Sequence, residues 1–201
     1  QTRGVRSECS GWYRASVRSF LRLLYALDLC DVLAAGPSSR SYSLVSFTLT
    51  IRDVPPTPDH WKRLREAFFR SLRRYDVTQV IWLTEWQARG APHLHGIVVL
   101  PADFTMLNFA QGWVCTAKAF RPAQSCQHVA AIWDSVGWCE YLGKHSARGV
   151  HHYQRSGANI PASWQGATGR MWGKRGDWPV RDPVPLRCDQ PSFFRLRRVL
   201  R

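Results

Sequence analysis

Residues 78–100 read TQVIWLTEWQARGAPHLHGIVVL, and the expected architecture starts from this stretch. Its two ends, 78–86 and 93–100, are rich in β-branched and aromatic residues, which favour strands. Between them, Gly90 and Pro92 are typical turn residues. The stretch therefore predicts a β-hairpin.

The predicted hairpin carries a candidate metal site. His93 and His95 are two residues apart on one strand, so their side chains share a face while Leu94 points to the other. Glu85 precedes the turn, and strand pairing can bring its carboxylate beside the two imidazoles. Mixed imidazole and carboxylate ligands suit Mn²⁺ or Mg²⁺, although imidazole also admits zinc. Two histidines on one strand often only face solvent, so the pattern needs support from elsewhere in the chain.

The hairpin is preceded by segments with clear periodicity. Residues 12–34 and 59–75 place apolar side chains at helical spacing and basic ones elsewhere, which predicts two amphipathic helices. Thr57 or Asp59 is the expected N-cap of the second. Residues 43–51 alternate as a strand does. After the hairpin, the pattern predicts a short helix over 103–113, a strand over 127–133, a helix over 134–146, and loops from Arg148 onward.

Charge indicates the partner. The 201 residues contain 28 Lys and Arg against 14 Asp and Glu, a formal net charge of +14, and such a surface attracts a polyanion such as nucleic acid. No run of about 18 uncharged apolar residues is present, so no transmembrane span is predicted. Six irregularly spaced cysteines without a C-x-x-C pair favour buried free thiols and a cytoplasmic location in a bacterial or phage-infected cell.

Two sequence patterns together carry a family resemblance. EWQARGAPHLHG at 85–96 is followed about 45 residues later by YLGK at 141–144, within a predicted helix. This combination resembles the HUH (His-hydrophobe-His) endonuclease superfamily, and within it the rolling-circle replication initiator (Rep) proteins of plasmids and single-stranded DNA phages. Residues 43–50, 89–96 and 141–144 resemble the family's first, second and third motifs, with weaker similarity over 170–174. The resemblance covers roughly residues 43–176.

The resemblance implies an α+β fold: a ferredoxin/RRM-like antiparallel β-sheet with helices packed on one face, here with an additional N-terminal helix. It implies that Glu85, His93 and His95 bind Mn²⁺ or Mg²⁺ and that Tyr141 attacks a DNA phosphodiester. The products would be a 5′-phosphotyrosine and a free 3′-OH. Lys144, one helical turn after Tyr141, would assist the phenolate.

Other residues refine this expectation. Some Rep families carry a second tyrosine four residues after the first, where this chain has His145, so the chain resembles the single-tyrosine type. Tyr153 is a rival nucleophile, but the Y-x-x-K spacing favours Tyr141. Cations interleaved with aromatic rings suit single-stranded DNA. The residues expected to bind DNA are Arg89, Arg148, Arg155, Arg170, Lys174 and Arg175.

The expected organisation is an N-terminal helical extension over 1–40, a nickase domain over 41–178 and a basic C-terminal tail over 179–201. The expected partners are single-stranded DNA at a replication origin and a separate helicase, because the chain has no G-x-x-x-x-G-K-[ST] motif. Alternatives remain open: a relaxase or single-strand transposase of the same superfamily, a non-catalytic nucleic-acid-binding domain, or a zinc-dependent hydrolase that uses an activated water.

Overall fold

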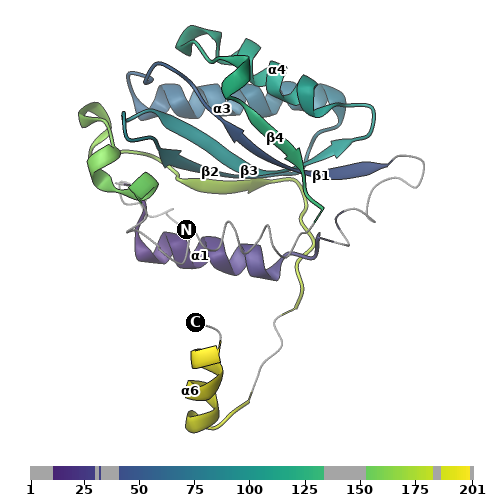
Figure 1. Ribbon diagram of the computed structural model, residues 1–201, viewed down its shortest axis with the longest axis vertical. Helices are drawn as coiled ribbons and strands as arrows, with labels where there is room; N and C mark the ends of the chain where they lie inside the picture. The colour runs from purple at the N-terminus through teal and green to yellow at the C-terminus, as the bar shows by residue number, and fades with distance from the viewer. Residues whose placement is uncertain (1–10, 30–31, 33–40, 134–152, 183–186, 200–201) are drawn as a thin grey trace, which may run out of the picture.

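A five-stranded antiparallel sheet organises the molecule (Figure 1). The computed structural model describes residues 11–29, 32, 41–133, 153–182 and 187–199. The strands are β1 (Tyr42–Leu49), β2 (Val80–Trp86), β3 (Pro92–Pro101), β4 (His128–Ala131) and β5 (Trp172–Arg175). The helices are α1 (Arg14–Ala26), α3 (Pro58–Leu72), α4 (Met106–Thr116) and α6 (Gln190–Val199). Short 3-10 turns are η1 (Arg73–Tyr75), η2 (Lys118–Phe120), η3 (Gln124–Cys126), η5 (Tyr153–Arg155), η6 (Gly157–Asn159) and η7 (Ala162–Trp164).

The order of elements along the chain gives the ferredoxin-like fold. From β1 to β4 the chain follows the order β1-α3-β2-β3-α4-β4, and the strands lie in the order β4-β1-β3-β2-β5. The predicted fold class is therefore confirmed, with β5 added beside β2. The two central strands, β1 and β3, pair along their whole lengths, with Thr48 opposite His95. Across the hairpin, Glu85 lies opposite His93.

Apolar side chains on one face of the sheet form a core with α3 and α4. Phe47 of β1 packs against Phe109 of α4, and the Trp61 indole of α3 donates a hydrogen bond to the Thr84 hydroxyl of β2. Gly96 of β3 is required in this layer, because a Cβ there would lie 2.1 Å from the carbonyl oxygen of Ile81 and 2.5 Å from the Phe47 ring. This explains why a glycine follows the His-Leu-His sequence.

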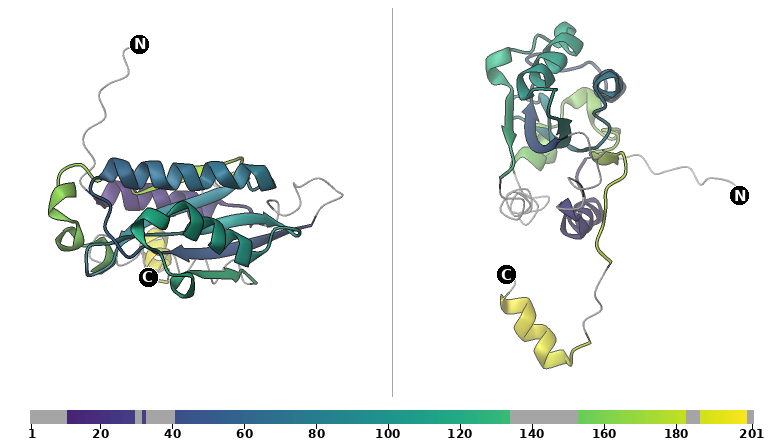
Figure 2. Two further views of the ribbon diagram at one scale, coloured as in Figure 1. Left: turned by 90° about the horizontal axis from the view of Figure 1, so that it is seen from above. Right: turned by 90° about the vertical axis from the view of Figure 1, so that its right-hand side faces the viewer.

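The opposite face of the sheet is partly covered by α1, as the right-hand view of Figure 2 shows. Phe20 of α1 packs against Trp172 of β5, and the Trp12 indole donates a hydrogen bond to the carbonyl of Thr84. Residues of α1 thus belong to the same hydrophobic core as the sheet. Among the described residues, no helix is both long enough and apolar enough to cross a membrane.

Several elements differ from the sequence prediction. The first helix ends at Ala26 rather than near residue 34, because Leu27 is extended and pairs with Val180. Residues after Arg148 include β5 and α6, where only loops were predicted. Three described cysteines are exposed, contrary to the expectation of buried thiols: Cys115, Cys126 and Cys188. The helix predicted over 134–146 lies outside the described residues.

Candidate metal centre

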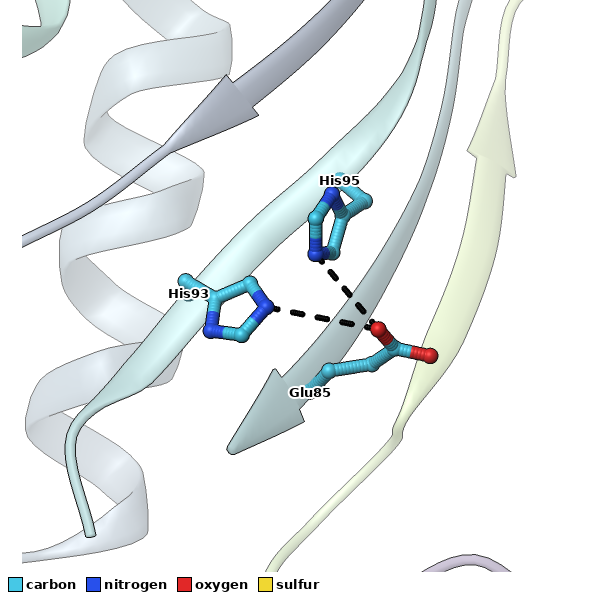
Figure 3. A group of neighbouring side chains, drawn as sticks. All are labelled: Glu85, His93 and His95. Carbon is cyan, nitrogen blue, oxygen red and sulfur yellow. Dashed lines mark ion pairs between the residues drawn. The ribbon is translucent and has the colours of Figure 1, made fainter. Parts of the chain in front are cut away.

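Glu85, His93 and His95 converge on the sheet face opposite α3 and α4 (Figure 3). Nε2 of His95 lies 3.4 Å from Oε2 of Glu85, and Nε2 of His93 lies 4.0 Å from the same oxygen. One ligand atom from each residue lies within 4.8 Å of the others. The hairpin register places these atoms together, as the sequence predicts, because Glu85 is opposite His93 and His95 is two residues further along the same face.

The three side chains fit a divalent cation. The side chains of Glu85 and His93 are only 4% and 3% exposed, whereas that of His95 is 18% exposed, so the cluster is open on one side. Burial lowers the pKa of His93 to about 3, and the neighbouring His95 acts in the same direction, so the His93 imidazole is neutral and has a free lone pair for a metal. A carboxylate with two neutral imidazoles is a ligand set for Mn²⁺, Mg²⁺ or zinc.

Thr48 holds the His95 ring in place. Its Oγ1 lies 2.8 Å from Nδ1 of His95, across the β1–β3 pair. When Nε2 of His95 binds a cation, Nδ1 carries the ring proton and donates it to this hydroxyl. Such second contacts to a metal-binding histidine fix the orientation and tautomer of its ring. Sequence reasoning missed Thr48, because the register between β1 and β3 is not visible in either strand alone.

Arg155 holds the Glu85 carboxylate from the other side. Its Nε donates a hydrogen bond of 2.7 Å to Oε1 of Glu85, and its side chain has no exposed area. The guanidinium carbon lies 4.3 Å from the ring centroid of Trp12. With Oε1 bound to Arg155, the second oxygen faces the histidines. The adjacent Gln154 places its Nε2 3.4 Å from Nε2 of His93. Both residues come from η5, which the sequence analysis treated as loop.

The residues expected to bind DNA occupy different environments. Arg155 is buried against Glu85 and Trp12, so it does not present a free guanidinium to DNA. Arg89 donates hydrogen bonds to the carbonyls of Ile51 and Arg52, which ties the hairpin turn to the end of β1. Arg170 and Lys174 are exposed and Arg175 is half-buried. The expected nucleophile and its neighbours lie outside the described residues: Tyr141, Lys144, His145 and Arg148.

Comparison with known proteins identifies the family of this chain. Residues 44–153 match a family model described as a replication-associated protein of the ORF2 type. The chain is 37% identical to the replication-associated protein of Pseudomonas phage Pf3, over 99% of this chain and 70% of that protein. It is also 37% identical to a putative replication protein of Xylella fastidiosa strain 9a5c, over 99% of this chain and 70% of the relative. No solved structure matches the chain. The matched region includes Glu85, His93 and His95, and the chain belongs to this family of phage and plasmid replication-associated proteins.

Proposed function

We propose that this protein is a metal-dependent HUH endonuclease that nicks and rejoins single-stranded DNA at a replication origin and thereby initiates rolling-circle replication. The observation that carries the proposal is the convergence of Glu85, His93 and His95 within 4.8 Å in a member of a replication-associated family. The basic net charge of +14 supports a nucleic-acid substrate. Within this proposal, residues 41–178 form the nickase domain, 1–40 an N-terminal extension and 179–201 a basic tail.

The described residues contribute a pre-arranged ligand set. A bound Mn²⁺ or Mg²⁺ would polarise the phosphate and offset the negative charge that develops on its oxygens. Glu85 and the two imidazoles hold their ligand atoms toward one point, and Thr48 and Arg155 restrain two of these side chains. Because the supporting contacts exist before DNA binds, little reorganisation is needed when the substrate arrives.

Tyr141 is the proposed nucleophile. Its phenolic oxygen forms a bond to phosphorus while the bond to the 3′ oxygen breaks, which gives a 5′-phosphotyrosine and a 3′-OH that a polymerase can extend. The free energy of the cleaved ester is kept for rejoining. Lys144, in Y-x-x-K spacing, would stabilise the phenolate and hold the phosphate. With one tyrosine in this motif, opening and rejoining would use the same side chain. A separate helicase would supply strand separation.

The test is covalent capture. The full chain is incubated with Mn²⁺ and a labelled single-stranded origin oligonucleotide and then resolved on a denaturing gel. A labelled protein band that is lost in Tyr141→Phe and retained in Tyr153→Phe supports the proposal. An adduct in Tyr141→Phe equal to that of the parent protein means that the nucleophile is wrong. Cleavage without any adduct means that the protein is a metal-dependent hydrolase that activates water.

A further inference from the structure

A second site lies between α3 and β5, on the sheet face opposite the metal cluster. The hollow there, called the α3–β5 pocket below, has a volume of about 660 Å³, which is within the usual range for ligand sites. Trp82 lies against β5, where a Cβ on Gly173 would be 2.8 Å from its ring, so this glycine allows the indole to pack flat against the edge strand. Basic side chains outnumber acidic ones in the lining: Lys62, Arg65, Arg170, Lys174 and Arg175 against Asp59 and Glu66.

Arg65 is the unusual member of this lining. It lies in the middle of α3, is only 6% exposed, and places its guanidinium carbon 3.7 Å from the ring centroid of Trp82. Throughout the described part of the chain, no carboxylate pairs with it and no hydrogen bond from it is formed. Burial lowers its pKa to about 9, which the charge of Glu66 opposes and those of Arg175 and Arg170 reinforce.

Such a cation needs a partner. A buried guanidinium without an anion loses hydration that stacking on an indole replaces only in part. Of the two carboxylates in the lining, Asp59 is already paired with Arg63 at 2.6 Å. An oxyanion in the pocket would supply the missing charge and accept the donors of the guanidinium, whose planar fork matches phosphate geometry.

The strand β5 connects this pocket with the face of the metal cluster. Lys174 is opposite Ile81, on the same face as Glu85, whereas Arg175 is opposite Val80, on the face of α3. The edge strand therefore carries a cation on each side. A polyanion that passes around this edge meets positive charge on both faces, which a compact free anion does not require.

We propose that the α3–β5 pocket binds a phosphate group of the single-stranded DNA, away from the phosphodiester that is cut, with Arg65 as its central ligand. The inference rests on the proposed function in one respect, that DNA is the substrate. The pocket then holds the flanking strand while the metal cluster acts on the scissile phosphate.

The test compares two single-charge variants of the full chain. Arg65→Met retains an apolar side chain against Trp82, and Arg74→Met removes an exposed cation of η1 that does not line the pocket. Fluorescence anisotropy with a labelled single-stranded oligonucleotide is expected to show about tenfold or greater loss of affinity for Arg65→Met, the loss of one charge-assisted hydrogen bond. The slope of log K against log salt should fall by about 0.7, one single-strand phosphate contact. Arg74→Met should change affinity less than twofold. Equal effects of the two variants overturn the proposal.

Folding and ligand source are controlled separately. Arg65→Met should unfold at the same temperature as the parent protein or higher, because it removes a buried unpaired charge. If it unfolds instead, Arg175→Gln at the half-buried wall replaces it in the same comparison. Inorganic phosphate is the second probe: if its binding depends on Arg65 while DNA affinity does not, the pocket serves a free anion and the DNA assignment is wrong.

Adduct formation separates this inference from the proposed function. At saturating DNA, the rate at which Arg65→Met forms the tyrosine adduct should equal that of the parent protein. If no adduct forms in any variant while Arg65→Met still loses DNA affinity, the pocket stands and the nicking mechanism falls. If adducts form normally and Arg65→Met binds DNA as tightly as Arg74→Met, the reverse holds.

Discussion

Arg155 Nε donates a hydrogen bond of 2.7 Å to Oε1 of Glu85, and both side chains are almost completely buried. This pair leaves Oε2 of the carboxylate directed at His93 and His95. Trp12 packs on the guanidinium and bonds to the carbonyl of Thr84, next to Glu85. Three segments that are distant in sequence therefore fix one ligand of the candidate metal centre.

Arg155→Met is expected to reduce stability in the absence of metal. Removal of one partner from a buried ion pair leaves Glu85 uncompensated, which costs about 3 to 5 kcal/mol. Urea unfolding in the presence of a chelator measures the loss. The double variant Arg155→Met with Glu85→Gln should recover part of it, because no unpaired charge remains. Strict additivity of the two single effects would show that the pair is not coupled.

Thr48→Val is expected to weaken Mn²⁺ binding by about tenfold or more, the usual effect of removing an outer contact to a metal-binding histidine. The substitution keeps the shape of the side chain but removes the hydrogen bond to Nδ1 of His95. Ser46→Ala is the matched control, since Ser46 lies on the same strand and bonds to the carbonyl of Ala130 instead. Calorimetric titration measures both. Equal affinities for the two variants would remove Thr48 from the metal centre.

Gly96→Ala is expected to destabilise the fold by about 3 kcal/mol or prevent folding, because the added carbon meets a backbone oxygen and the Phe47 ring. Gly112→Ala in α4 is the control. There the nearest atom to a new Cβ is in the Phe68 ring at 3.6 Å, an ordinary contact, and alanine is the better helix former by about 1 kcal/mol. Thermal unfolding should therefore move in opposite directions for the two variants. A loss of stability in both would point to general intolerance at glycines.

Mn²⁺ itself is expected to stabilise the protein. At a metal concentration of about 100 times the dissociation constant, binding to the folded state adds about 2.7 kcal/mol. For a chain of this size, that corresponds to a rise of roughly 5 to 10 °C in the unfolding midpoint. Scanning calorimetry with and without a chelator measures it. A similar rise in the variant that combines His93→Ala and His95→Ala would place the metal elsewhere.

The hairpin carries most of what the sequence could predict. Alternating residues in β2 and β3 indicate two strands, and pairing across a short turn brings Glu85 to the histidines without further information. Local patterns also predict α3 and its N-cap, since the Thr57 hydroxyl accepts from the backbone N–H of His60. These features depend on neighbours in the chain.

Features that depend on distant contacts escaped the sequence. The pairing of Thr48 with His95 requires the β1–β3 register, and Arg155 appears in the sequence as one cation among many in a basic region. The edge strand β5 is short and contains Gly173, so it has no alternating pattern. Arg65 sits among polar residues of α3, and only the packing of Trp82 beneath it shows that it is buried.

The most direct test of the metal centre is anomalous diffraction from crystals of the full chain grown with Mn²⁺. A peak bounded by Nε2 of His93, Nε2 of His95 and Oε2 of Glu85 is expected, and it should disappear in crystals of Glu85→Ala. The absence of that peak from the parent protein at saturating Mn²⁺, or its persistence in the variant, would contradict the account.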